Sequence, residues 1–152
     1  HRHVPLDQFY TGYRQSLLAP DEVLAGVVVP RPAPGEWLGA YKVSKRQEDD
    51  ISAVCLAVQL QVADGRITSA RIGAGGVAAT PARALQTEAA LIGQPWNEAT
   101  LAVAQQVIAQ EFSPLSDLRA SADYRRTILG QLLRRAWLES NGQATVRLED
   151  LT

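Results

Sequence analysis

Cysteine and methionine are almost missing from this chain of 152 residues, which has one cysteine and no methionine. A single cysteine cannot form an internal disulfide. Cys55 lies within an apolar run, so we expect it to be a small core residue of a cytoplasmic protein. The first residues, His1 to Pro5, contain no apolar stretch typical of a secretion signal. A start of this kind, without methionine, suggests a fragment of a longer protein.

Long apolar runs and an excess of one charge are also missing. The stretch from Ala53 to Leu60 is too short to span a bilayer, so no membrane partner is expected. The net charge is −1 and basic residues are spread along the chain, which argues against nucleic acid as a partner. The only histidines are His1 and His3, and a serine nucleophile motif and metal-binding spacings are absent. The sequence alone therefore predicts no self-sufficient catalytic or metal site.

The first half of the chain reads as β-strands. Ile51 to Val62 is the clearest, because Val54, Leu56, Val58, Leu60 and Val62 fall on one face at a period of two. Its other face begins with Ala53, Cys55 and Ala57, so we expect its first half to be covered on both sides. Asp64-Gly65 indicates a hairpin turn. The four predicted strands are Val23–Val29, Trp37–Ser44, Ile51–Val62 and Ile67–Ile72, with a proline-rich hairpin loop over 31–35 between the first two.

The second half reads as three helices. The first is predicted to begin at Thr80-Pro81 and to bury Leu85, Ala89 and Ile92. The second begins near Asn97 and buries Leu101, Ala104, Val107, Ile108 and Phe112; the third runs from Ser121 to Ser140 and buries Tyr124, Ile128, Leu132, Leu133, Ala136 and Trp137. Strands followed by helices predict one α+β domain, an antiparallel sheet of three to four strands followed by three helices packed on one face. Residues 1–19 form a lead-in segment, and residues 143–152 form a C-terminal tail.

A charged loop, Lys45 to Asp50, joins two of the predicted strands without glycine or proline. A tight hairpin would join the strands with fewer residues, so a longer charged connection is a candidate site. The alternative is a solvated cluster of charges, which composition alone favours. Lys42, just before the loop, either contacts a ligand or extends its ammonium group into water.

Two further stretches have both a ligand-binding and a structural interpretation. Gly73 to Ala79 fits neither the dinucleotide nor the phosphate-loop spacing, so close packing of strand on helix is preferred to a ligand loop. In the polar stretch before the third helix, Asp117 and Arg119 are expected to hold the loop, while Ser121 caps the helix.

Five stretches combine into a pattern of specific order and spacing: 9–14 (FYTGYR), 17–22 (LLAPDE), 45–51 (KRQEDDI), 75–81 (GGVAATP) and 116–125 (SDLRASADYR). They cover nearly the whole chain. The pattern resembles the C-terminal domain of the FAD-binding small subunit of bacterial xanthine dehydrogenase and of related molybdenum hydroxylases, including the flavoproteins of carbon monoxide dehydrogenases.

The resemblance implies a domain that covers FAD within an oxidoreductase of purine catabolism. Electrons would pass from a molybdopterin centre through 2Fe-2S clusters to FAD and then to NAD⁺, and the cofactors other than FAD would belong to other parts of the enzyme. The partners implied are the preceding FAD-binding domain and the molybdopterin-binding large subunit. Leu24 and Lys42 match FAD-contacting positions of the family. Arg46 and Asp49 match its flavin-adjacent loop, where Gln47 departs from the basic residue of the animal enzymes.

Two other function classes stay open. The chain is either a structural or assembly module that docks a partner subunit without a ligand, or a free-standing small-molecule binding domain. An exposed apolar patch around Tyr13 and Val23–Val29 would favour the flavoprotein domain, since another domain should cover it. A self-contained pocket would favour the binding domain.

Overall fold

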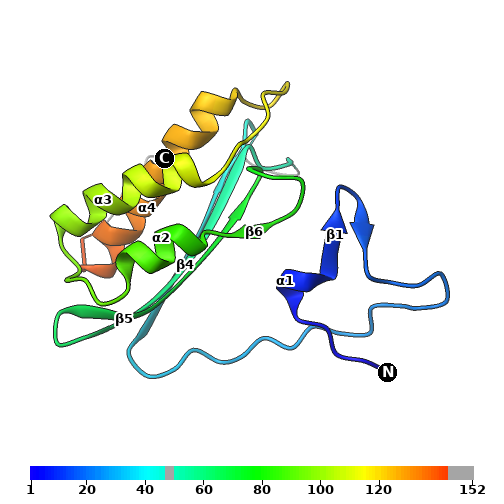
Figure 1. The fold of residues 1–152 in the computed structure, drawn as a ribbon, viewed down its shortest axis with the longest axis horizontal. Helices are drawn as coiled ribbons and strands as arrows, with labels where there is room; N and C mark the ends of the chain where they lie inside the picture. The colour runs from blue at the N-terminus through cyan, green and yellow to red at the C-terminus, as the bar shows by residue number, and fades with distance from the viewer. Residues whose placement is uncertain (47–49, 144–152) are drawn as a thin grey trace.

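The computed structural model describes residues 1–46 and 50–143. Asp49 and almost all of the 143–152 tail lie outside the described residues. The elements are α1 (Leu6–Phe9), β1 (Tyr10–Gly12), β2 (Gln15–Ser16), β3 (Glu36–Val43), β4 (Val54–Ala63), β5 (Arg66–Gly75), β6 (Ala82–Arg83), α2 (Leu85–Leu91), α3 (Glu98–Glu111) and α4 (Ala122–Ser140). Figure 1 shows them in two parts, the helices with the sheet and a small N-terminal unit beside them.

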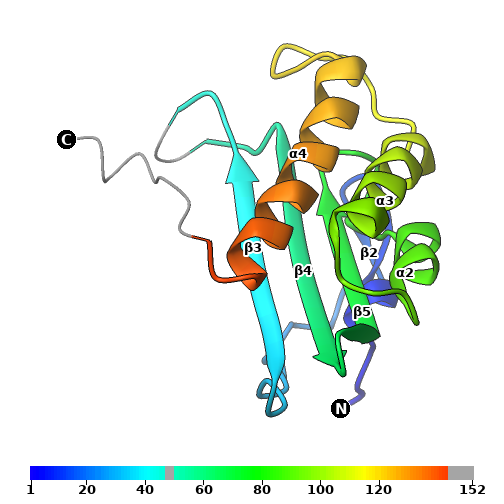
Figure 2. The same cartoon turned by 90° about the vertical axis from the view of Figure 1, so that its left-hand side faces the viewer.

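The main sheet is antiparallel throughout, in the order β3-β4-β5-β6. Asp64 and Gly65, with φ of 51° and 73°, form the predicted turn between β4 and β5. Helices α2, α3 and α4 cover one face of this sheet (Figure 2). The predicted α+β class, with three helices on one face of an antiparallel sheet, is confirmed.

The core lies between the sheet and the helices. Val54, Leu56, Val58 and Leu60 of β4 are fully buried, as their spacing predicts. They pack with Ile67 and Ile72 of β5 and with the inward side chains of α3 and α4: Leu101, Ala104, Ile108, Leu129, Leu133 and Ala136. Because a strand alternates its side chains, the same pattern sends every second residue of β4 to the outer face of the sheet.

Two of the three helix starts follow the sequence. Asn97 accepts a hydrogen bond from the Thr100 N–H, and Ser121 accepts one from the Tyr124 N–H, so both cap their helices. The cap at Ser121 and the helix start near Asn97 were predicted. The predicted start at Thr80-Pro81 is wrong, because Ala82 and Arg83 pair with β5 instead.

The cap of α2 comes from another helix. The Glu111 carboxylate accepts hydrogen bonds from the Gln86 and Thr87 N–H groups, at 2.7 and 3.0 Å, and from the Thr87 hydroxyl. A carboxylate from α3 therefore caps α2 in place of a side chain at the start of the helix itself.

The predicted inner face of α2 is also wrong: Leu85, Ala89 and Ile92 are exposed. Glu88 determines which side of α2 faces the core. Its buried carboxylate accepts hydrogen bonds from the Ile72 N–H at 2.8 Å and from the Arg83 guanidinium. A buried carboxylate needs such partners, and meeting that need outweighs the burial of apolar side chains. On α4, Tyr124 is likewise exposed rather than buried.

The predicted strand Val23–Val29 is wrong. These residues have no regular secondary structure, and Val23, Leu24, Val27, Val28 and Val29 are exposed. The proline-rich stretch that follows is therefore not a hairpin loop. β-Branched residues favour a strand only where a neighbouring strand offers partners, and among the described residues none lies beside this segment. β6 supplies the fourth strand.

The outer face of the sheet, away from the helices, carries small side chains at the end nearest the charged loop, where Ala40, Ala57, Gly73, Cys55 and Gly75 lie. Cys55 is half-buried there and Ala57 is exposed, so Cys55 is not a core residue and this end of β4 is covered on one side only. The N-terminal unit, the β1–β2 hairpin with α1, lies on this side of the sheet (Figure 1). In the part of the chain that the structure describes, no helix has the length and hydropathy needed to cross a membrane.

Candidate functional site

The charged loop leaves the sheet at the end of β3 and returns at the start of β4. Its base is closed by a hydrogen bond of 2.7 Å from the Ala53 N–H to the Val43 carbonyl. Within the loop, the Asp50 carboxylate accepts from the Arg46 N–H at 3.0 Å and forms an ion pair of 3.5 Å with the Arg46 guanidinium. The hydrogen bond from that N–H is the main cause that lowers the pKa of Asp50. The described part of the loop is thus ordered by its own charges.

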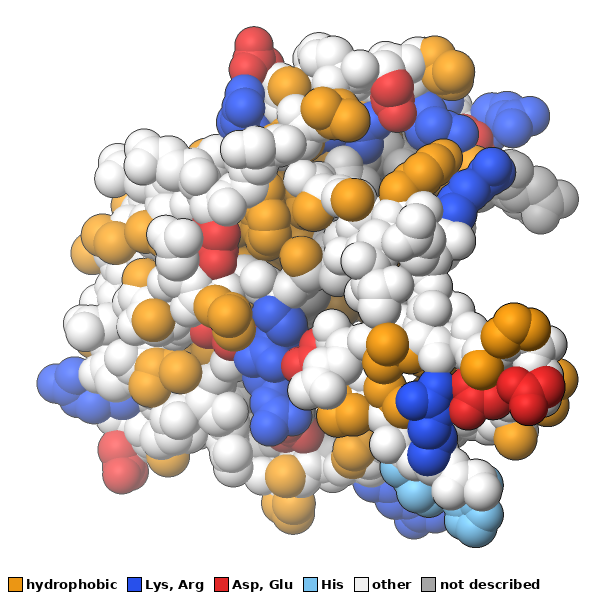
Figure 3. Space-filling view, turned by 45° about the vertical axis from the view of Figure 1, so that its right-hand side comes forward, with side chains coloured by type: hydrophobic (Ala, Val, Ile, Leu, Met, Phe, Trp, Pro, Cys, Tyr) orange, Lys and Arg blue, Asp and Glu red, His pale blue; other side chains and the backbone are white. Residues whose placement is uncertain are grey.

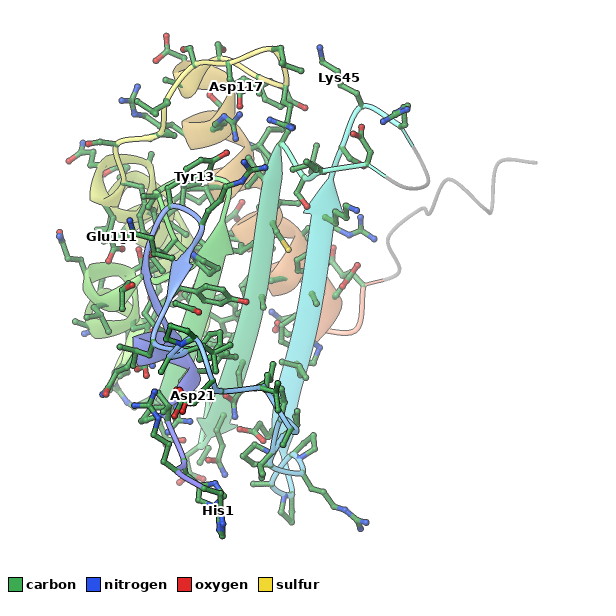
Figure 4. All side chains as sticks on the ribbon, turned by 90° about the vertical axis from the view of Figure 1, so that its right-hand side faces the viewer. His1, Tyr13, Asp21, Lys45, Glu111 and Asp117 are labelled. Atoms are coloured by element: carbon green, nitrogen blue, oxygen red, sulfur yellow. The ribbon has the colours of Figure 1, made fainter. Side chains whose placement is uncertain are left out.

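A second loop, residues 112–121 before α4, lies at the same end of the sheet; we call it the pre-α4 loop. In Figure 4, Lys45 and Asp117 are both at this end. The Lys45 ammonium donates a hydrogen bond of 2.7 Å to the Leu118 carbonyl, which joins the charged loop to the pre-α4 loop.

Arg125, in the first turns of α4, is buried and joins three segments. Its guanidinium donates to the Ala53 carbonyl at 2.5 Å, to the Gly76 carbonyl at 2.7 Å and to the Asp117 carboxylate at 2.5 Å. Gly76 has a φ of +77°, and a Cβ there would lie 2.5 Å from the Ala53 oxygen. Glycine is therefore required where the turn after β5 meets the start of β4. The predicted packing of strand on helix is found in part: Gly76 closely approaches the Ala53 backbone and Arg125 of α4, whereas a Cβ at Gly73 would meet nothing within 4 Å.

Asp117 organises the pre-α4 loop. Its carboxylate accepts hydrogen bonds from the Arg119 N–H at 2.8 Å and the Ala120 N–H at 3.1 Å, besides the Arg125 guanidinium. These backbone bonds, followed by Arg125, lower the pKa of Asp117 to about 2. The predicted structural role of the Asp117–Ser121 stretch is confirmed.

The two loops border a cleft of about 370 Å³. It is lined by Val43, Ser44, Lys45, Ala53, Arg119, Ala120, Ser121 and Tyr124. Within the described residues, no group of three metal-ligating side chains is present here or elsewhere.

The other predicted site residues lie apart from this cleft. Lys42 is exposed on the outer face of β3, where its neighbours across the sheet are Cys55 and Gly75. Leu24 is exposed in the extended segment that leads from the N-terminal unit to β3. Arg46 lies in the charged loop, as described, and Asp49 is outside the described residues. The structure thus brings Lys42 and Arg46 to one end of β3 and shows no contact that joins Leu24 to them.

Exposed apolar side chains are frequent in the N-terminal part. Tyr13 is 73% exposed, and the five exposed residues of the 23–29 segment range from 58% to 84%. Orange side chains are visible on this side of the molecule in Figure 3. Monomeric proteins rarely leave apolar side chains uncovered in such numbers, so this surface is suited to contact with another domain.

Tyr41 forms a network that the sequence did not reveal. Its hydroxyl donates a hydrogen bond of 2.6 Å to the Glu139 carboxylate, which also accepts from Arg135, and the Arg135 guanidinium lies over the Tyr41 ring. Burial, and then this hydrogen bond, raise the pKa of Tyr41. The network ties β3, just before Lys42, to the end of α4.

A known protein family matches most of the chain. Residues 39–140 match the CO dehydrogenase flavoprotein C-terminal domain. The chain belongs to this family. Most of β3, strands β4 to β6, helices α2 to α4 and both loops lie inside the matched range, whereas the N-terminal unit and the exposed 23–29 segment precede it.

Several curated and solved flavoprotein-family members are similar to the chain. It is 37% identical over 135 residues to a xanthine dehydrogenase/oxidase of Gallus gallus, covering 84% of this chain and 10% of that protein. It is 30% identical over 142 residues to the nicotine 6-hydroxylase medium subunit of Paenarthrobacter nicotinovorans, covering 93% of this chain and 49% of that subunit. The carbon monoxide dehydrogenase of Hydrogenophaga pseudoflava shares the fold with a TM-score of 0.85 and 31% identity, over 95% of this chain and 50% of that one. The chain therefore spans about half of such subunits and a tenth of the longest relatives.

Arg125 is the residue of this site that sequence reasoning missed. It lies in the first turns of the third helix, directly after the polar stretch whose charges Asp117, Arg119 and Ser121 already explained. A signal was nevertheless present: Arg125 lies four residues before Leu129 and eight before Leu133, on the buried face of the helix. An arginine on such a face needs acceptors within the protein.

Proposed function

We propose that this chain is the domain that covers FAD in the FAD-binding subunit of a molybdenum hydroxylase similar to xanthine dehydrogenase. In this proposal it shapes electron transfer from iron–sulfur clusters through FAD to NAD⁺. The supporting observations are the outer face of the sheet, away from α2, α3 and α4, where small side chains and Lys42 lie, and the exposed apolar side chains of the 23–29 segment. The family match makes a flavin-binding domain the natural cover for these surfaces.

The outer face of the sheet fits a flat aromatic ring. Ala40, Ala57 and Gly73 are neighbours across β3, β4 and β5, and in the next row Lys42 is followed by Cys55 and Gly75. Such a row of small residues allows a planar group to approach the backbone closely, while Lys42 offers a charged donor at its edge. FAD, when bound, supplies the two-electron chemistry.

The described residues offer no cradle for the FAD phosphates. The glycines of the 73–76 stretch lie in β5 and in the turn after it, and no helix begins there. Phosphate binding usually needs a glycine-rich turn at the start of a helix. The pyrophosphate would therefore be held by the preceding domain, and this chain would contribute Leu24 and Lys42 to the cofactor.

The charged loop would lie beside the flavin, with Arg46 and Asp49 as the residues nearest to it. Fixed charges near a reducible ring change its reduction potential, and more strongly where water is excluded. The loop would therefore set how readily electrons leave for NAD⁺. A molybdopterin-binding large subunit and the preceding FAD-binding domain are the partners in this proposal.

The alternative, an assembly module without ligand contact, shares the exposed apolar surface but gives Lys42 no role. The test is Lys42→Met in the complete flavoprotein subunit, with Arg134→Met, exposed on α4, as a matched control. Loss of a charge-assisted hydrogen bond costs about 1.5–3 kcal/mol, so FAD should be retained about 10- to 100-fold less tightly after dialysis. Retention equal to that of the control would contradict the proposal and favour the assembly module.

The isolated chain gives a second test. Since it lacks a phosphate cradle, titration with FAD should produce no saturable quenching of flavin fluorescence below about millimolar concentration, in line with the few contacts available. A micromolar complex would mean that the chain is a free-standing binding domain.

A further inference from the structure

We propose that Arg125 is a positioning residue that, together with Lys45, fixes the described ends of the charged loop, with Arg46 and Asp50, relative to the flavin. The inference rests on the proposed function, because it needs the flavin beside this loop. It goes further by assigning the placement of the loop charges to an arginine outside the loop.

The geometry shows two attachments, one on each side of the loop. At its start, the Lys45 ammonium donates to the Leu118 carbonyl at 2.7 Å. At its end, the Ala53 carbonyl accepts from Arg125 at 2.5 Å. The residues between these two points include Arg46 and Asp50, the paired charges of the described loop.

Both attachments connect to the same group of residues, which Arg125 and Asp117 hold together. Leu118 follows Asp117, whose carboxylate accepts from the Arg119 and Ala120 N–H groups and from the same Arg125. Arg125 is only 4% exposed and lies on α4, whose neighbouring turns pack in the core. The described ends of the loop are therefore held through a buried residue of α4 as well as by the strands that flank them.

Arginine is needed for this role. One of its terminal nitrogens serves two backbone carbonyls, of Ala53 and Gly76, while the other serves the Asp117 carboxylate. A planar fork keeps these acceptors at fixed angles, whereas a lysine ammonium is a single point with freely turning donors. Arg125→Lys retains the charge but loses this geometry. Because Coulomb energy varies with the inverse of distance, a small shift of the loop charges changes the potential felt by a nearby ring.

An arginine at the opposite edge of the sheet, away from the charged loop, provides the control. Arg83 donates to the buried Glu88 carboxylate at the opposite edge of the sheet, on β6. Arg83→Lys should lower stability, as Arg125→Lys does, without reaching the charged loop. Any effect of Arg125→Lys that Arg83→Lys does not share is an effect on the loop.

The experiment measures the flavin midpoint potential and the ratio of NAD⁺ reduction to reduction of an artificial acceptor, in the complete enzyme. The variants are Arg125→Lys, Lys45→Met, the double variant of these two, Lys45→Arg, Arg46→Gln and the Arg83→Lys control. We expect Arg125→Lys and Lys45→Met to shift the potential in the same direction and to change the acceptor ratio by about threefold or more. The double variant should shift less than the sum, since both release the same loop. The control should match wild type.

The outcomes separate the two proposals. If Arg46→Gln shifts the potential but Lys45→Met and Arg125→Lys do not, the positioning role is wrong and the proposed function stands. If Arg46→Gln also leaves the potential unchanged, the loop does not lie beside the flavin and that part of the proposed function is wrong. If Arg125→Lys fails to fold, Lys45→Arg decides alone, because it keeps the charge, changes only the donor to the Leu118 carbonyl and, at an exposed position, leaves the core intact.

Discussion

Replacing Arg125 by methionine should be among the most destabilising single changes in the chain. Methionine keeps the long unbranched stem and removes only the guanidinium, so three acceptors lose their hydrogen-bond donor. The Ala53 carbonyl belongs to a buried residue and has no water to replace its donor, whereas Gly76 and Asp117 are partly exposed and are rehydrated. A buried acceptor left without a donor costs about 1–3 kcal/mol. With a smaller cost for the other two, we expect a loss of about 2–4 kcal/mol in the free energy of unfolding.

Urea denaturation followed by circular dichroism gives the measurement. For a chain of this size, about 1 kcal/mol corresponds to roughly 2–4 °C in Tm, so Tm should fall by roughly 5–15 °C. The neighbouring Arg126→Met is the control, because its ion pair with Asp123 is exposed and should contribute less than about 1 kcal/mol. Equal losses for the two variants, at unchanged m-values, would refute the argument that burial decides the cost.

Three further predictions concern other contacts. Glu111→Ala should lower the free energy of unfolding by about 1–2 kcal/mol, because the α2 N–H groups lose their cap, and should exceed the loss for Glu98→Ala; thermal melts showing the reverse order would contradict the interhelical cap. The lowered pKa of Asp117 stabilises the fold in full above its ordinary value of 3.8, and this contribution is lost as pH falls toward about 2. Acid denaturation of Asp117→Asn should therefore be flatter over this range, and an unchanged slope would refute it. The pKa of Tyr41 is raised, so its contribution is present below its ordinary value of 10.0 and is lost as pH rises above it; Tyr41→Phe should remove this alkaline loss, and a wild-type alkaline curve for the variant would count against it.

Elements with strong local periodicity were predictable from the sequence. β4 alternates from Val54 to Leu60, after which an irregularity in the pairing leaves the predicted core residue Val62 39% exposed. α3 and α4 combine an apolar stripe with a capping Asn97 or Ser121. In these cases local preference and burial agree, so one sequence window contains the whole signal. The family resemblance, carried by motifs along the chain, added what no window contains, and the match over residues 39–140 confirms it.

Elements whose partners lie far along the chain were not predictable. α2 is set by Glu88, which bonds to β5, and by Glu111 of α3, neither of which a window around Thr80 reveals. The Val23–Val29 segment failed for the opposite reason, since its composition favours a strand but the described residues offer it no neighbour.

The candidate site divides in the same way. The charged loop and the cap at Ser121 were visible in the sequence, and Lys42 was singled out by resemblance. Arg125 was hidden because the acceptors that justify its burial come from Ala53 and Gly76, 72 and 49 residues away. Backbone carbonyls leave no trace in residue identity, so this kind of contact cannot be read from sequence.

That same use of backbone carbonyls has a consequence for how the domain can diversify. Every residue type has a carbonyl oxygen, so the acceptors offered to Arg125 by residues 53 and 76, and to Lys45 by residue 118, survive any substitution that keeps the backbone path. Residues of the charged loop other than Lys45 can then be exchanged during evolution without loss of these acceptors. The sequence of the loop can change while the helix that anchors its ends stays the same.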